Sequence, residues 1–129
     1  MDVHQDCILI VEPYLLVRHP LAEYLRECGY RVLEATDADE ARQLLSDARI
    51  SVDVALADVD APGGSGFALA GWIRANHPSI DVILAGTVAK ATEEAGNLCQ
   101  EGPTASKPYD HQLLLDHIRR SRAARDRNR

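Results

Sequence analysis

The sequence predicts an α/β protein in which helices cover both faces of a parallel sheet. Short apolar runs alternate with amphipathic segments five times along the 129 residues, which is the pattern of a chain that winds strand, helix, strand. Hydrophobic residues make up 46% and charged residues 26%, as in globular domains with a buried core. The length is that of one domain. We therefore expect a single domain over residues 1–129, with its core in about 7–120.

The predicted strands are short runs of apolar residues, several of them β-branched. They lie at residues 7–11, 31–35, 53–57, 81–85 and, more briefly, 104–106. The first run, Cys7-Ile8-Leu9-Ile10-Val11, contains no polar residue. Continuous apolar runs of this length are typical of strands that are covered on both faces.

The segments between the strands carry apolar residues at intervals of three and four, which is the period of a helix. The expected helices cover about 14–28, 37–46, 67–76, 89–100, and from 111 into the C-terminal end. Asp37 and Glu40 have the spacing of a capping box, and Gly29 follows the first helix, as helix-ending glycines do. Pro20 lacks an N–H and is expected to bend or loosen the first helix.

The charge of the chain is unevenly distributed. The net charge is −6, but residues 119–129 hold six arginines against one aspartate, so this end carries +5 and the rest −11. The acidic body argues against nucleic-acid binding by this domain. We interpret the basic end as a solvated helix terminus, where arginines suit the helix dipole. Contact with an acidic partner or with phosphates is the alternative.

The sequence also bears on the compartment. It contains no pattern of a signal peptide and no apolar stretch of the roughly 20 residues that span a membrane, so a cytoplasmic location without membrane contact is expected. The three cysteines, Cys7, Cys28 and Cys99, match no metal-binding spacing. We expect free thiols in a reducing compartment.

Charged residues at the ends of predicted strands form the candidate site. Glu12 ends the first strand, Asp58 the third and Lys107 the fifth. In parallel sheets, ligands bind at the edge where the carboxyl ends of the strands meet. Paired carboxylates suit Mg²⁺, and a lysine ammonium can hold a phosphoryl oxygen. Asp58 is therefore predicted to be a nucleophile that accepts a phosphoryl group.

Several segments, taken in this order, resemble the receiver domain of two-component response regulators. They span nearly the whole chain and comprise residues 8–12, 21–25, 29–32, 57–59, Pro62-Gly63, Gly66-Phe67 and 106–109. The resemblance implies a flavodoxin-like sheet of five parallel strands in the order 2-1-3-4-5, with five helices. It also implies that Asp58 is phosphorylated and that Lys107 senses the phosphoryl group. Mg²⁺ would be held by Glu12, Asp58 and the backbone carbonyl of Asp60.

The resemblance further implies the partners of the domain. The phosphoryl donor would be a histidine kinase or a histidine phosphotransfer protein. The output would be contact with a downstream protein, made around the fourth and fifth helices, where the family docks or forms homodimers. No enzymatic activity is expected apart from self-hydrolysis of the phosphoryl group.

The sequence departs from the family near the metal site. Pro13 replaces the second of two adjacent acidic residues, and the lost charge would cost on the order of 1 kcal/mol if that ligand acted through water. The side chain of Asp60 is either a compensating ligand or a loop carboxylate that makes a turn.

The residues that report phosphorylation in the family are also altered. Ala85 stands where a serine or threonine is usual, with Gly86 in the usual register, and Thr87 could substitute only if the loop bends back. Thr104 replaces an aromatic residue three positions before Lys107. We therefore expect phosphorylation without the family's usual switch.

Three other functions compete with this interpretation. The first is a degenerate receiver that binds partners regardless of phosphate. The second is a haloacid-dehalogenase-like phosphatase, whose two-aspartate spacing occurs in Asp58-Val59-Asp60, although the chain has little room for a cap. The third is a flavodoxin-like FMN carrier, for which Glu12-Pro13-Tyr14 is the wrong chemistry for a phosphate loop.

Overall fold

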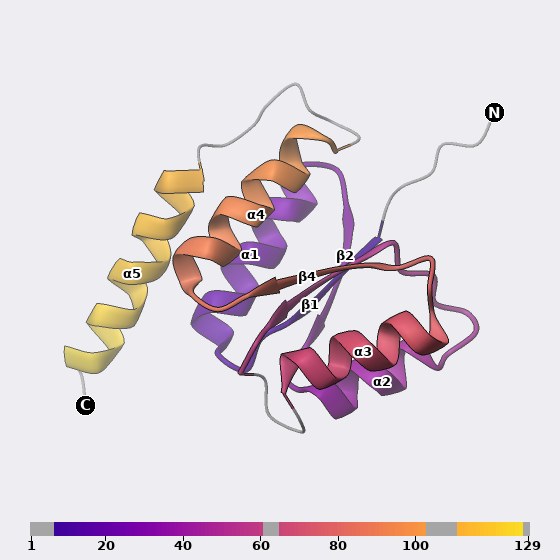
Figure 1. The fold of residues 1–129 in the computed structure, drawn as a ribbon. Coiled ribbons are helices and arrows are strands. Elements are labelled where there is room, and N and C mark those ends of the chain that lie inside the picture. The colour runs from indigo at the N-terminus through magenta and orange to yellow at the C-terminus, as the bar shows by residue number, and fades with distance from the viewer. Residues whose placement is uncertain (1–6, 61–64, 103–110, 128–129) are drawn as a thin grey trace.

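The computed structural model describes residues 7–60, 65–102 and 111–127, which form a parallel sheet with helices on both faces (Figure 1). The strands are β1 Cys7–Val11, β2 Arg31–Ala35, β3 Val54–Asp58 and β4 Asp81–Ala85. The helices are α1 Leu15–Glu27, α2 Ala38–Leu45, α3 Gly66–Asn76, α4 Val88–Gln100 and α5 His111–Arg127. The predicted α/β class and the five helices are confirmed.

The described sheet has four parallel strands in the order β2-β1-β3-β4. This order agrees with the first four positions of the predicted 2-1-3-4-5. The sheet falls short of the predicted five strands because residues 104–106, expected to form the last one, lie outside the described residues. The fifth strand therefore stays a prediction.

Strand β1 lies in the middle of the molecule and contributes to two cores. Cys7, Leu9 and Val11 pack towards α2 and α3, while Ile8 and Ile10 pack towards α1 and α4. Side chains alternate between the two faces of a strand, so a strand with helices on both sides buries every residue. The unbroken apolar sequence of β1 follows from this position.

Helices α1 and α4 cover the same face of the sheet, and α5 lies outside them against both (Figure 1). Helix α5 is anchored by Leu115 and Ile118, which are buried. From there it runs towards the end of the molecule where the carboxyl ends of β1 and β3 lie. None of the described helices is both long and apolar enough to cross a membrane.

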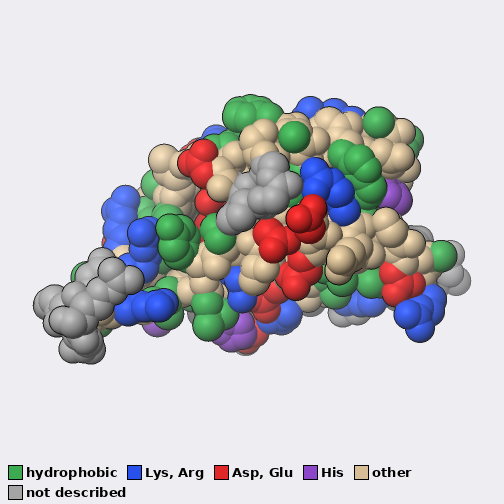
Figure 2. Space-filling view, turned by 90° about the horizontal axis from the view of Figure 1, so that it is seen from below, with side chains coloured by type: hydrophobic (Ala, Val, Ile, Leu, Met, Phe, Trp, Pro, Cys, Tyr) green, Lys and Arg blue, Asp and Glu red, His purple; other side chains and the backbone are tan. Residues whose placement is uncertain are grey.

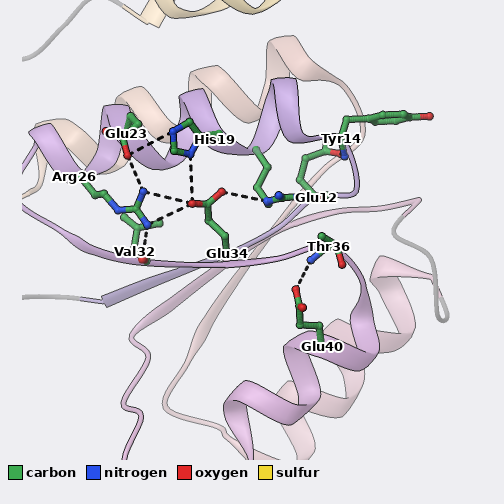
Figure 3. Close-up of polar contacts among 10 residues, drawn as sticks. Glu12, Tyr14, His19, Glu23, Arg26, Val32, Glu34, Thr36 and Glu40 are labelled. Carbon is green, nitrogen blue, oxygen red and sulfur yellow. Dashed lines mark hydrogen bonds and ion pairs between the residues drawn. The ribbon is translucent and has the colours of Figure 1, made fainter.

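Local signals at the helix ends behave as predicted. The Asp37 side chain accepts a hydrogen bond from the Glu40 N–H at 2.7 Å, and Glu40 in turn accepts from the Thr36 N–H at 2.7 Å, which Figure 3 shows. Gly29 follows α1 with a φ of 96°, a conformation that favours glycine. Pro20 lies inside α1, and the helix continues through it to Glu27.

The cysteines correct one expectation. Cys28 at the end of α1 and Cys99 near the end of α4 form a disulfide, with Cα atoms 5.3 Å apart. Only Cys7 is a free, buried thiol. The pairing joins residues 71 positions apart in sequence, so it depends on how α4 packs against α1. The spacing of the cysteines in the sequence does not predict this disulfide.

Candidate functional site

A small cavity of about 120 Å³ opens at the carboxyl ends of β1, β3 and β4. The polar side chains of the described residues that line it are those of Glu12, Asp58, Asp60, Thr87 and Arg122. Figure 2 views the molecule from this end and shows a group of acidic side chains near its centre. The fold thus brings together the two carboxylates predicted to end strands one and three.

Glu12 is held by its main chain on both sides. Its N–H donates to the Ala35 carbonyl at 3.0 Å, which extends the β1–β2 pairing by one residue. Its carbonyl accepts from Nη1 of Arg18 at 3.0 Å. Its carboxylate accepts from the N–H of Tyr14 at 2.9 Å, the residue that precedes α1. Glu12 therefore places a carboxyl group just before the first turn of α1, which has no acidic residue of its own.

An ion-pair network fixes the arginine that holds Glu12. Arg18 Nε lies 3.1 Å from Oε1 of Glu34 on β2, and the Arg18 side chain is only 12% exposed. The other Glu34 oxygen lies 3.4 Å from Nη2 of Arg26, and Figure 3 shows Glu34 between His19 and Arg26. The network ties α1 to β2 and so orients the guanidinium that binds the Glu12 carbonyl.

Asp58 is the last residue of β3 and lies directly beside Ala85 of β4 in the strand register. Its Oδ1 accepts a hydrogen bond from the N–H of Asp60 at 2.9 Å, which fixes the direction of the carboxylate. The next residue, Val59, donates its N–H to the Ala85 carbonyl at 3.2 Å. Asp58 is thus half-buried at the floor of the cavity, on rigid backbone.

Gly66 allows α3 to begin against the end of β3. Its N–H donates to the Val59 carbonyl at 2.8 Å. A Cβ at this position would lie 2.4 Å from the Asp58 carbonyl oxygen, far inside van der Waals contact. Only glycine fits this close approach, which explains why Gly66 belongs to the pattern that resembled the family.

The carboxyl groups of Glu12 and Asp58 line the same cavity, and the charge of Asp58 acts on Glu12. Burial raises the pKa of Glu12 from its ordinary 4.5 to about 7, and the charge of Asp58 adds to the effect, while the Tyr14 N–H and the Arg122 charge oppose it. Near neutral pH Glu12 therefore still carries its proton in a large fraction of molecules, which avoids two negative charges side by side. A cation bound in place of the proton would relieve the repulsion between the two groups.

The side chains in the cavity that could bind a metal ion offer oxygen atoms, which are the ligands that Mg²⁺ requires. Within the described parts of the chain, no group of three or more histidine, cysteine, aspartate or glutamate side chains could hold a metal. Two carboxylates are sufficient for Mg²⁺, because this ion keeps several of its waters. Glu12 and Asp58 therefore fit the ion, with Asp60 next to them on the surface.

Three of the four predicted switch positions, Ala85, Gly86 and Thr87, lie at the same cavity. Ala85 is buried next to Asp58 and has no hydroxyl to offer, and Gly86 follows it at the rim. The Thr87 hydroxyl caps α4 by accepting from the Lys90 N–H at 3.0 Å. Of the remaining predicted site residues, Thr104 and Lys107 lie outside the described residues.

Sequence reasoning missed Arg122 as a residue of this cavity. Its guanidinium carbon lies 5.7 Å from the centre of the Tyr14 ring, and the residue lines the cavity with Glu12 and Asp58. The charge pattern favours a solvated helix terminus for Arg122, with contact to an acidic partner or to phosphates as the alternative. A signal existed in the helical period, because Arg122 follows the buried Ile118 by four residues and so lies on the same face of α5.

Comparison with known proteins identifies the family of the domain. Residues 8–119 match the family model of the response regulator receiver domain. A cyclic di-GMP phosphodiesterase of Thermotoga maritima is 33% identical over 120 residues, which cover 89% of this chain and 31% of that protein. The response regulator protein FleR of Pseudomonas aeruginosa is 30% identical over 115 residues, covering 88% and 24%. The chain spans about a third or less of the length of these relatives.

Solved structures show the same fold. The signal receiver domain of an HD domain-containing protein from Pseudomonas fluorescens is 27% identical, with a TM-score of 0.61 over 91% of this chain and 94% of that one. The response regulator TrrA of Thermotoga maritima, in complex with Mg²⁺-BeF, is 32% identical, with a TM-score of 0.56 over 61% and 67%. The chain belongs to the response regulator receiver domain family of two-component systems.

Proposed function

We propose that this receiver domain accepts a phosphoryl group on Asp58 with the help of Mg²⁺ and signals through protein contacts. The observation that carries the proposal is the pair of carboxyl groups, Glu12 and Asp58, that line one cavity at the ends of neighbouring parallel strands. The raised pKa of Glu12 indicates a site that favours added positive charge.

Asp58 would act as the nucleophile. One of its carboxylate oxygens attacks phosphorus and forms an O–P bond, while the bond between phosphorus and the donor's leaving group breaks. The Asp60 N–H holds Oδ1 of Asp58 at 2.9 Å, so the carboxylate is oriented before the donor arrives. Such pre-orientation lowers the entropic part of the barrier.

Glu12, Asp58 and the backbone carbonyl of Asp60 would hold the metal. Mg²⁺ supplies positive charge to the carboxylate pair and to the phosphoryl oxygens. The Asp60 side chain, which is exposed, would contribute long-range charge. The related regulator TrrA forms a complex with Mg²⁺-BeF, which supports the choice of ion.

The proposed partners are those of a signalling relay. A histidine kinase or histidine phosphotransfer protein would donate the phosphoryl group, and Lys107 would contact it once it is on Asp58. A downstream protein, or a second copy of the domain, would bind the surface near α4 and α5. The domain would act in the cytoplasm and would show no catalytic turnover beyond loss of its own phosphoryl group.

Phosphorylation by acetyl phosphate and Mg²⁺, followed by intact-mass spectrometry, tests the proposal. We expect one added phosphoryl mass in the wild type and none in Asp58→Asn. Asp81→Asn is the matched control, because this exposed aspartate begins β4 at the opposite edge of the sheet and should leave the adduct intact. A wild-type protein without an adduct, from acetyl phosphate or from a cognate kinase, would favour the degenerate receiver instead.

A further inference from the structure

Arg122 is the only cationic side chain among the described residues that line the Asp58 cavity. It comes from the far end of the chain, on the last helix, whereas the carboxylates belong to β1 and β3. Figure 2 shows basic side chains gathered at the end of the molecule where α5 ends, next to the face that holds the acidic ones. This cation is additional to the lysine predicted at residue 107.

The position of Arg122 is set by packing. Ile118, one turn earlier on α5, is fully buried among residues of α1 and α4. The Arg122 guanidinium lies over the ring of Tyr14, with its carbon 5.7 Å from the ring centre, within the range of a cation–π contact. The N–H of Tyr14 donates to the Glu12 carboxylate. Arg122 is therefore seated on the same short segment that carries the first carboxylate of the site.

The residue beside Asp58 in the sheet offers no side-chain hydrogen-bond donor to an anion, and Arg122 can supply one. Ala85, directly beside Asp58 in the sheet, offers no hydrogen-bond donor from its side chain. The Thr87 hydroxyl accepts from the Lys90 N–H at the first turn of α4 and can offer at most one O–H donor. A guanidinium has five N–H donors in a planar fork that matches phosphoryl oxygens. Arg122 is thus the described side chain best equipped to hold an anion in this cavity.

We propose that Arg122 is a phosphoryl-binding residue of this receiver, which holds the group on Asp58 from the C-terminal helix. The inference rests on the proposed phosphorylation of Asp58. The same positive charge opposes binding of a divalent cation to Glu12 and Asp58, because like charges repel across the shared cavity. Arg122 therefore strengthens the binding of the phosphoryl group and weakens the binding of the divalent cation.

Two binding measurements on Arg122→Ala test the assignment. Mg²⁺ affinity is measured by calorimetry on the unphosphorylated protein. Affinity for beryllofluoride, a phosphoryl mimic, is measured by fluorine NMR at saturating Mg²⁺. Arg120→Ala is the matched control, since this arginine is also exposed on α5 but does not line the cavity.

Removal of Arg122 should tighten Mg²⁺ binding and weaken beryllofluoride binding, each by about two- to fivefold, the range of exposed charge pairs. Arg120→Ala should change both less. Arg122→Lys should keep the wild-type Mg²⁺ affinity, because the charge remains, and should recover only part of the anion affinity.

Equal affinities in Arg122→Ala and Arg120→Ala would refute the inference, as would a parallel loss of both ligands in Arg122→Ala, which indicates structural damage. Failure of the proposed function looks different. In that case the wild-type protein itself would bind no beryllofluoride. If the wild type binds beryllofluoride and Arg122→Ala binds it equally well, only the role of this arginine is overturned.

Discussion

Replacing Glu12 by glutamine should remove a large pH dependence from the stability of the domain. Glutamine has nearly the same shape and can still accept the hydrogen bond from the N–H of Tyr14. It cannot ionise beside Asp58. The comparison between wild type and Glu12→Gln therefore isolates the cost of a second negative charge in the buried pair.

The magnitude follows from the pKa of Glu12. Burial raises it from 4.5 to about 7 in the folded protein, so the folded state binds more protons than the unfolded state between these values. The free energy of unfolding must then fall as the pH rises through this window. At about 1.4 kcal/mol per pKa unit, the loss due to Glu12 is about 2–3 kcal/mol between about pH 5 and about pH 8.

Urea unfolding across this pH range, with a chelator present, measures the effect. The difference between wild type and Glu12→Gln should grow by that amount towards high pH, in favour of glutamine. Glu27→Gln, which changes an exposed glutamate at the end of α1, controls for the loss of one carboxylate. Parallel pH curves for wild type and Glu12→Gln would show that the pKa of Glu12 is not raised in the folded protein. Saturating Mg²⁺ should abolish the difference by neutralising the pair.

Three further changes test contacts that stabilise the fold or position the site. Gly66→Ala would place a Cβ 2.4 Å from the carbonyl oxygen at the end of β3, and we expect a loss of about 2–3 kcal/mol in urea unfolding; Gly71→Ala, with open space around it, should be neutral or stabilising. The Cys28→Ala/Cys99→Ala double variant should lose about 4 kcal/mol of unfolding free energy, because the disulfide closes a span of 71 residues, and a reductant should destabilise the wild type alone. Glu34→Gln removes the carboxylate that orients the Arg18 guanidinium, which holds the Glu12 carbonyl, so calorimetry should show a Mg²⁺ affinity a few-fold weaker. An unchanged affinity would mean that this ion-pair network does not position the metal site.

The elements of this fold follow from local patterns in the sequence. The apolar run of β1, the helical periods and the capping pair Asp37 and Glu40 each depend on residues within a few positions of one another. Their order along the chain then predicts a parallel sheet. Because the carboxyl ends of parallel strands share one edge, Glu12 and Asp58 could also be predicted to meet. The roles of Lys107 and Thr104 stay predictions, since both lie outside the described residues.

Other features depend on how distant segments pack, and only the tertiary structure decides them. The disulfide needs the ends of α1 and α4 side by side. The raised pKa of Glu12 needs burial and a second carboxyl group from another strand. Arg122 reaches the cavity because α5 is anchored on α1 and α4 one turn earlier. The sequence alone determined which residues end the strands, and the packing of the last helix decided which cation faces them.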